Sequence, residues 1–401
     1  MAEAARRIEE LQEQVRHRII AEMDMSRALS DEEVMGLIDE AVIDEGRRSG
    51  LDIGQIGEVS RGVFNALRKL DVLQELVDDP AVSEIMIIGP DKVFVERAGR
   101  LQRWAKRFAS AEKLGDVIQQ IVSKGNRMVN EINPIVDTRL ENGSRVNVVL
   151  GPVALDGPVV TIRRFPDDPF TMGDLVEKNT LSAEVAEFLG EMVVFGQNIF
   201  VSGGTSSGKT TFLNALAGYI PSGERVITIE DSAELNLKNV ENLVRLETRN
   251  ENSEGKNAIS IRDLIKTSLR MRPDRIVVGE VRSGEALDMI SAMNSGHDGS
   301  LSTGHANSCR DMLKRLETMI LMAADMPVDA IRGQIAAGVD LMVHLARNRK
   351  GERKLVAVEE LVGYEAGEFV LNPIYRYRSS GDEECWERIG DLKNTEKIGG
   401  F

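Results

Sequence analysis

The sequence predicts an α/β protein in three parts: an N-terminal helical module, a small α+β domain, and a larger domain with a mainly parallel sheet and flanking helices. Strand-like and helix-like segments alternate from Leu175 to about Arg376, which is typical of a parallel sheet. Alternating apolar and polar residues precede that stretch, and the start of the chain has helical spacing instead. A chain of 401 residues has room for several domains.

Charge and composition narrow the classes of function. The net charge is −15, and 42% of the residues are hydrophobic, as is ordinary for a globular protein. Because nucleic-acid phosphates are bound by clustered Lys and Arg, we expect no direct nucleic-acid binding by this acidic chain. We expect a cytoplasmic protein that meets membranes only through partners. The first residues lack the apolar core of a signal peptide, and no run reaches about 18 apolar residues.

The first segment, residues 1–70, is predicted to be the helical module. The stretch SDEEVMGLIDEAVIDEG has apolar residues at helical spacing, and either Ser30 or Asp31 would cap its helix. Two interpretations stay open for this module. It is either a solvated helical bundle with no further role, or a module that docks a partner of a larger assembly.

The second segment, residues 71–170, is predicted to be the small α+β domain. SEIMIIGPDKVFVERAGRLQR alternates apolar and polar residues, as short antiparallel strands do. SAEKLGDVIQQIVSKGN is typical of a helix capped by Ser110. RLENGSRVNVVL predicts a hairpin with Asn142 and Gly143 in its turn, and VVTIRRF predicts a last strand.

The third segment, residues 171–376, is predicted to be the parallel-sheet domain. PDDPFTMGD, in which prolines and acidic residues gather, is the expected linker in front of it. Residues 377–401 carry little pattern, so we expect a C-terminal tail there.

A glycine-rich loop lies between a strand near residues 198–202 and a helix that opens at Thr211. Its letters, GGTSSGKT, fit the P-loop pattern G-x-x-x-x-G-K-[ST]. In such a loop, glycines let backbone N–H groups converge on phosphate oxygens, and the helix N-terminus adds a partial positive charge. We predict that Lys209 reaches the β- and γ-phosphates and that the Thr210 hydroxyl ligates Mg²⁺. The predicted nucleotide-binding residues are Gly203, Gly204, Thr205, Ser206, Ser207, Gly208, Lys209, Thr210 and Thr211.

ATP is the expected nucleotide. Guanine recognition usually needs an [NT]KxD element, and none follows the P-loop. The alternative, a glycine-rich turn that happens to precede a lysine, does not explain why the motif lies between a strand and a helix.

Carboxylates follow two further predicted strands. RVITIEDSAEL delivers Glu230 and Asp231 at a strand end and Glu234 one turn later, and PDRIVVGEVR ends in Glu280. Ligands of open α/β sheets bind at the carboxyl ends of strands, so these groups suit Mg²⁺ coordination and water positioning. We expect Glu280 to position the water and to hold Mg²⁺, directly or through water, with Glu234 as second choice. The alternatives are an acidic helix start and a surface ion pair.

Two of the four histidines lie close together in the sequence. His305 stands among small residues in GSLSTGHANS, after a predicted strand, and His297 stands upstream in NSGHDG. A histidine near a γ-phosphate can hydrogen-bond it and respond to its loss. The alternative for both is a buried, hydrogen-bonded structural role.

Arginines of the small α+β domain complete the candidate site. Arg139 and Arg145 flank the LENGS turn, and Arg163 and Arg164 end the last strand of that domain. Arginine pairs well with phosphate because its guanidinium offers several N–H donors in a fixed fork. The alternative is that these are surface arginines on an acidic protein.

Taken in this order, the motifs resemble those of the type II/IV secretion ATPase superfamily. GGTSSGKT looks like its Walker A, TIEDSAEL like its Asp box, PDRIVVGEVR like its Walker B and STGHANS like its His box. Upstream, SEIMIIGPDKVFVER, DTRLENGSRVNVV and TIRRF look closest to the CpaF/TadA branch, the Flp (Tad) pilus assembly ATPases. The resemblance covers residues 70–376 and includes a helical N-terminal module.

The resemblance implies a RecA-like ATPase domain that uses ATP and Mg²⁺. It also implies a ring, expected to be a homohexamer, at the cytoplasmic face of the inner membrane. Hydrolysis would power assembly of a Tad-type pilus, with or without retraction, through inner-membrane platform proteins. Some relatives carry a tetracysteine zinc element. Here Cys309 and Cys385 are the two cysteines and form no CxxC pair, so no zinc is expected.

Two alternative functions stay open. A type IV secretion or conjugation ATPase, which energises protein or DNA export, shares these motifs. A nucleotide-gated ring scaffold with little turnover would also bind ATP, although the intact Glu280, Asp box and Thr210 argue against it. The direction of movement, the pilin, the firing order and the arginines that act in trans are left open by the sequence.

Overall fold

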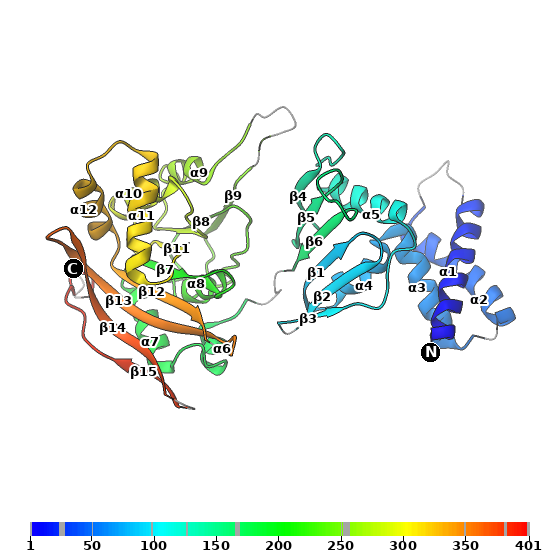
Figure 1. Cartoon of the computed structure of the whole chain (residues 1–401), viewed down its shortest axis with the longest axis horizontal. Coiled ribbons are helices and arrows are strands. Elements are labelled where there is room, and N and C mark those ends of the chain that lie inside the picture. Colours follow the sequence, from blue (N-terminus) through cyan, green and yellow to red (C-terminus); the bar gives the residue numbers. More distant parts are fainter. Residues whose placement is uncertain are drawn as a thin grey trace. The chain divides into compact units, whose positions relative to one another are not determined.

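The computed structural model describes residues 2–23, 29–49, 51–97, 99–125, 127–164, 169–249, 251, 257–348, 350–380 and 383–398. The chain divides into two compact units, Met1–Asp167 and Asp168–Phe401 (Figure 1). The expected linker begins at residues 166–168, which lie outside the described residues, so it stays a prediction. The three-part division of the chain also stays a prediction.

The first unit begins with three helices that pack on one another: α1 (Ala2–Glu22), α2 (Asp31–Ser49) and α3 (Ile53–Arg68). Ser30, rather than Asp31, caps α2. Its hydroxyl accepts a hydrogen bond from Glu33 N, and the Glu33 carboxylate accepts one from Ser30 N. The apolar faces of the three helices share a core that includes Val15, Ile19, Val34, Ile38, Val59 and Val63.

A six-stranded antiparallel sheet follows in the same unit, in the order β3-β2-β1-β6-β5-β4. Its strands are β1 (Val82–Ile88), β2 (Lys92–Arg97), β3 (Arg100–Arg103), β4 (Ile135–Arg139), β5 (Arg145–Val149) and β6 (Val159–Arg163). The accompanying helices are η1 (Asp71–Leu73), α4 (Gln74–Asp78) and α5 (Ala111–Lys124).

Local signals in the sequence explain two elements of this sheet domain. Ser110 caps α5 as predicted, because its side chain accepts a hydrogen bond from Lys113 N. The turn between β4 and β5 contains Gly143, whose φ of 83° suits glycine, and this confirms the predicted hairpin. Helix α5 covers one face of the sheet, and the apolar side chains of β5 and β6 that point there are buried with it.

The second unit holds a nine-stranded sheet with helices on both faces (Figure 1). The helices are α6 (Met172–Glu177), α7 (Ala183–Val194), α8 (Lys209–Ala217), α9 (Ile261–Ser268), α10 (Glu285–Met293), α11 (Cys309–Ala323) and α12 (Val328–Gly338). The strands are β7 (Ile199–Gly203), β8 (Val226–Glu230), β9 (Leu243–Glu247), β10 (Arg275–Val278), β11 (Leu301–His305), β12 (Leu341–Arg347), β13 (Arg353–Glu365), β14 (Glu368–Ser380) and β15 (Glu383–Arg388).

The sheet is mixed, in the order β15-β14-β13-β12-β7-β11-β10-β8-β9. The strands from β12 to β9 in this order pair in parallel, and β13, β14 and β15 add antiparallel pairs at the β12 edge. Every residue of β7, β8 and β10 is buried, as parallel strands covered on both faces require. Ile199 and Val201 pack with α6, α7 and α8, whereas Phe200 packs with α9 to α12.

The end of the chain differs from the predicted tail of residues 377–401. Strand β15 pairs with β14, and Trp386 Nε1 donates to the carbonyl oxygen of Leu355. Beyond it, the backbone N–H groups of Lys393 and Asn394 donate to the buried carboxylate of Glu360. The sequence of β15, EECWER, is mostly polar because it forms a sheet edge, and this hides the strand from a pattern search.

Within the described ranges, no helix has both the length and the apolar character needed to cross a membrane.

Candidate functional site

The loop between β7 and α8 can only be built around glycine. A Cβ added to Gly203 would lie 2.6 Å from the carbonyl oxygen of Leu345 and 2.5 Å from Ser207 Oγ. Gly208 has a φ of 93° directly before α8, and Ser206 also has a positive φ, of 58°. The backbone at Gly203 and Gly208 therefore requires glycine, and the phosphate-binding role of the loop stays a prediction.

Lys209, the first residue of α8, is buried beneath this loop. Its Nζ lies 3.1 Å from the carbonyl oxygen of Gly204 and 3.2 Å from His305 Nδ1. Burial lowers the pKa of Lys209. Because an ammonium group only donates, Nδ1 is the unprotonated nitrogen of His305 in this contact.

His305 joins the P-loop lysine to the end of β10. Its Nε2 lies 2.9 Å from Glu280 Oε1, and this buried oxygen accepts no aligned hydrogen bond from the part of the chain that the structure describes. Burial lowers the pKa of His305. The structure thus brings together the predicted residues Lys209, His305 and Glu280.

Arg282 extends the same contacts to the Asp box. One terminal nitrogen donates to Glu280 Oε2 at 3.0 Å, and the other donates to Asp231 Oδ2 at 3.3 Å. The hydrogen bond to Glu280 raises the pKa of Arg282. The sequence analysis assigned no role to this residue. Its only signal was a basic residue two positions after the strand-end glutamate.

Glu230 is held by backbone donors, and the catalytic role predicted for it stays a prediction. It is 3% exposed, and its carboxylate accepts hydrogen bonds from the backbone N–H groups of Glu234 and Leu235. Burial raises the pKa of Glu230 to about 7. Its oxygens are engaged by the turn that carries Asp231 and Glu234, so Glu230 shapes this turn.

The other residues of the predicted P-loop differ in exposure, and their contact with phosphate stays a prediction. Gly204, Thr205 and Ser206 are exposed, and Thr210 and Thr211 are half-buried in the first turn of α8. Ser207 is buried, and its Oγ has no hydrogen-bond partner among the residues that the structure describes. A buried hydroxyl with no partner at this position fits a site that holds a polar ligand.

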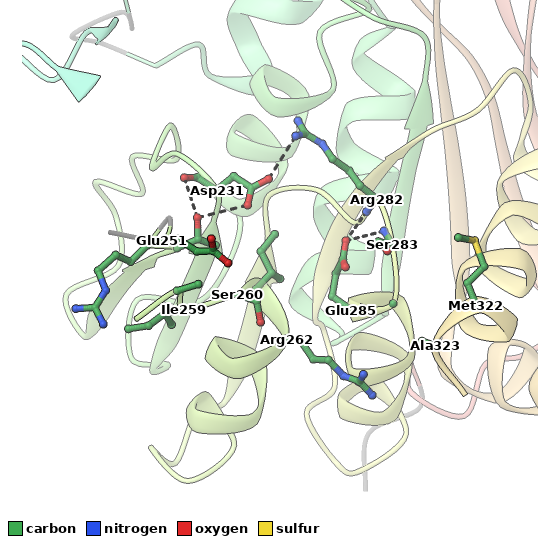
Figure 2. A pocket seen from close by; sticks show the side chains of 15 residues that line it. Asp231, Glu251, Ile259, Ser260, Arg262, Arg282, Ser283, Glu285, Met322 and Ala323 are labelled. Atoms are coloured by element: carbon green, nitrogen blue, oxygen red, sulfur yellow. Dashed lines mark hydrogen bonds and ion pairs between the residues drawn. The ribbon is translucent and has the colours of Figure 1, made fainter. Parts of the chain in front are cut away.

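A cavity of about 650 Å³ lies beside this network (Figure 2). Figure 2 shows the contact between Asp231 and Arg282 on its wall, with Glu285 accepting hydrogen bonds from the backbone of Arg282 and Ser283. Its lining residues are Asp231, Thr248, Arg249, Glu251, residues 258–262, residues 282–285, Met322 and Ala323. None of them belongs to the P-loop, so the cavity continues the site on the side of β8 and α9.

His297 lies apart from Lys209, His305 and Glu280, and the nucleotide contact predicted for it stays a prediction. It precedes β11, whereas His305 ends it, so the two histidines flank opposite ends of one strand. Strand β11 pairs with β7 from Leu301↔Ile199 to His305↔Gly203, which puts only His305 beside the P-loop. His297 Nδ1 instead lies 3.2 Å from Ser295 Oγ.

The four predicted arginines belong to the first unit, whereas the P-loop belongs to the second. Arg139 pairs with Arg145, and Arg145 pairs with Arg163, across adjacent strands. Directly paired residues share a face of a sheet, so these three arginines form one row on β4, β5 and β6. Arg164 is turned elsewhere, and its guanidinium donates to the carbonyl oxygen of Asp79.

The residues of the second unit fit a Mg²⁺ ion that is coordinated jointly by the protein and by phosphate oxygens. Among the described residues, no group of three or more His, Cys, Asp or Glu side chains is placed to hold a metal ion. Mg²⁺ in nucleotide sites is usually held by one or two protein oxygens together with phosphates and waters. Thr210 in the first turn of α8 and Glu280 after β10 offer the oxygen donors that suit such a shared arrangement.

These features define an α/β protein with a P-loop at the carboxyl edge of a parallel sheet. A family model described as "Type II/IV secretion system protein" matches residues 66–386, and the chain belongs to this family. This confirms the superfamily that the motifs resemble. The CpaF/TadA branch stays a prediction.

Individual proteins that are similar to this chain also come from secretion, conjugation and pilus systems. A putative conjugal transfer protein of Mycobacterium tuberculosis is 32% identical over 296 residues, which are 72% of this chain and 84% of that protein. The type IV secretion system protein VirB11 of Brucella suis is 31% identical over 303 residues, covering 69% and 84%. The crystal structure of the pilus retraction motor PilT with bound ADP has the same fold. Its TM-score is 0.54 at 21% identity, over 74% of this chain and 83% of that one.

Proposed function

We propose that this protein is a Mg²⁺-dependent ATPase that works as a homohexameric motor on a membrane-bound machine. The observation that carries the proposal is the line of contacts from Lys209 through His305 to Glu280. It joins three of the four motifs at one edge of the sheet. Hydrolysis of a γ-phosphate needs positive charge on the phosphates and a placed water more than covalent chemistry.

Each residue of this line has a distinct task in the proposal. Lys209 and the backbone N–H groups of the P-loop bind the β- and γ-phosphates, and Thr210 and Glu280 hold Mg²⁺ together with them. The ion supplies charge neutralisation when bound. Glu280 Oε1 is buried and faces His305 Nε2 at 2.9 Å, and it accepts no aligned hydrogen bond from the described residues, so it is placed to accept one from the attacking water. His305 lies within reach of both Lys209 and Glu280, so it is placed to respond to the γ-phosphate.

The ring is proposed because the predicted phosphate-binding lysine and the predicted phosphate-binding arginines belong to different units of the chain. The second unit supplies Lys209, while the row of Arg139, Arg145 and Arg163 lies on the first unit. In a ring, the first unit of one protomer can meet the P-loop of its neighbour, so hydrolysis is coupled to movement between protomers. A homohexamer is the proposed form.

The motifs favour a role in pilus assembly. Because the upstream stretches resemble those of the CpaF/TadA branch, we propose a motor that acts on Tad pilus platform proteins at the cytoplasmic face of the inner membrane. Type IV secretion or conjugation is the second candidate, and the names of relatives that are 31–32% identical favour it. Under either role, contact with the membrane is made through partner proteins.

Steady-state phosphate release tests the enzyme. Lys209→Ala should lose nucleotide affinity and turnover together, because a positive charge on the phosphates is removed. Glu280→Gln should keep nucleotide affinity and lose turnover, because shape is kept while water placement fails. Arg378→Gln, an exposed change on β14, is the matched control and should behave as the unmodified protein. Normal turnover in Glu280→Gln would refute the role of β10, and tight binding without turnover in the unmodified protein would favour the ring scaffold.

Genetic deletion separates the two machines. Cells that lack the gene are scored for surface pili and, separately, for conjugal transfer or protein export. Loss of pili with normal export supports the first role, and loss of export with normal pili supports the second.

A further inference from the structure

The hairpin between β12 and β13 brings two arginines onto the P-loop. Arg347 ends β12, Arg353 begins β13, and the two residues are paired across these strands. Arg347 Nε donates to the carbonyl oxygen of Ser206 at 3.0 Å, and Arg353 Nε donates to the same oxygen at 3.3 Å. We call these two side chains the hairpin arginines.

The approach of Arg353 to the loop depends on a glycine. A Cβ added to Gly208 would lie 3.1 Å from Arg353 Cδ, which is tighter than ordinary van der Waals contact. Gly208 therefore serves two purposes, since its φ of 93° also requires glycine. The stem of Arg353 covers the outer side of the loop directly before α8.

The hairpin arginines add positive charge to a loop built for anions. Their shared acceptor is an uncharged carbonyl oxygen, and both side chains are exposed. Among the described residues, the contact of the Arg347 guanidinium is with this carbonyl oxygen, and no carboxylate pairs with it. A guanidinium has five N–H donors, so one contact through Nε does not exhaust it. Arg282 differs from Arg347 in this respect, because Glu280 and Asp231 already balance the charge of Arg282.

The order of strands fixes which end of a nucleotide these arginines would meet. Strand β7 lies between β12 on one side and β11, followed by β10, on the other. His305 of β11 and Glu280 at the end of β10 mark the side of the γ-phosphate in the proposed function. A polyphosphate whose γ end lies there directs its α end toward β12 and β13.

We propose that Arg347 and Arg353 bind the α-phosphate end of the nucleotide from the same protomer as the P-loop, while their Nε atoms hold the Ser206 carbonyl. This inference rests on the proposed function, because it assigns further binding residues to the same site. A role limited to bracing the loop is the competing explanation. The two explanations make different demands on the side chain at position 347. Phosphate binding requires its positive charge, whereas bracing the loop requires only a hydrogen-bond donor.

The test measures equilibrium binding by calorimetry on the full chain, with a non-hydrolysable ATP analogue, the corresponding GTP analogue and ADP. Arg347→Gln removes the charge and keeps an N–H donor, whereas Arg347→Lys keeps the charge. We expect Arg347→Gln to weaken all three ligands by similar factors, about tenfold to a hundredfold, the usual range for hydrogen bonds to charged groups. Arg347→Lys should lose less, and the control Arg378→Gln should lose nothing.

The outcomes separate this inference from the proposed function. Unchanged affinity in Arg347→Gln, while Lys209→Ala abolishes binding, would overturn the inference alone. Three other results would also overturn the inference. They are tighter nucleotide binding by Arg347→Gln than by Arg347→Lys, a loss of affinity for the ATP analogue but not for ADP, and a loss of affinity for only one of the two bases. No nucleotide binding by the unmodified protein would overturn both. Urea unfolding of each variant checks the fold, and we expect the midpoint to stay unchanged because the side chain is exposed.

Discussion

Replacing Glu230 by Gln should make the second unit more stable at neutral pH, by an amount that grows with pH. Burial raises the pKa of Glu230 from its ordinary value of 4.5 to about 7 in the folded protein. The folded state therefore holds this proton more tightly than the unfolded state does. The stability associated with the proton is fully present below pH 4.5 and is lost as pH rises through 7.

The magnitude follows from the same shift. A change of one pKa unit corresponds to about 1.4 kcal/mol, so ionising Glu230 in the folded state costs about 3 kcal/mol above its folded pKa. The glutamine amide carries no charge and avoids this cost, and its oxygen can still accept from the backbone N–H of Glu234. The difference in unfolding free energy between Glu230→Gln and the parent should rise by about 2–3 kcal/mol between pH 5 and pH 8.

Urea unfolding followed by tryptophan fluorescence measures this difference. The chain has two tryptophans, Trp104 in the first unit and Trp386 in the second, so a Trp104→Phe background leaves one reporter on the second unit. Asp263→Asn is the contrasting control. Its hydrogen bonds with Ser260 lower the pKa of Asp263, so its stability contribution is lost as pH falls instead. A difference between Glu230→Gln and the parent that stays flat from pH 5 to pH 8 would refute the reasoning.

Two further predictions concern catalysis. His305→Ala should slow phosphate release far more than it lowers the melting temperature, because His305 contacts Lys209 and is partly exposed; residual turnover that tracks the folded fraction would instead indicate a structural role. Lys209→Ala and Arg145→Ala should each be inactive alone, the arginine change by roughly 10³-fold or more, yet mixtures that exchange subunits should regain activity. No recovery, with exchange shown independently, would contradict a site built in trans, and Arg139→Ala repeats the test for the other arginine of the turn.

The motifs could be predicted from sequence because their signals are local. The P-loop is a fixed spacing of glycines and a lysine between a strand and a helix, and the helix caps at Ser30 and Ser110 are equally local. Glu280 and His305 could be placed near the loop because the carboxyl ends of neighbouring parallel strands share one edge.

Contacts made by exposed arginines could not be predicted in the same way. Arg282 lies beside its partner glutamate in sequence, but its second contact, to Asp231, depends on β8 lying next to β10. Arg347 and Arg353 reach Ser206 only because an antiparallel hairpin is added to β12, which itself pairs with β7. Pairing between distant strands is not encoded in any local spacing, so these residues have no signal of their own.

Strand register, rather than closeness in sequence, decides which polar side chains reach the site. His305 lies opposite Gly203 because β11 pairs with β7 in one register, and the other four residues of β11 are buried. A shift by one residue would turn every side chain of β11 to the opposite face and would break the buried hydrogen bond from Thr303 Oγ1 to the carbonyl oxygen of Gly279, so the observed register is favoured. His297, eight positions earlier, then lies beyond the far end of the strand. The same argument places Arg139, Arg145 and Arg163 together on the first unit although up to 24 residues separate them, because pairing across β4, β5 and β6 puts all three in one row.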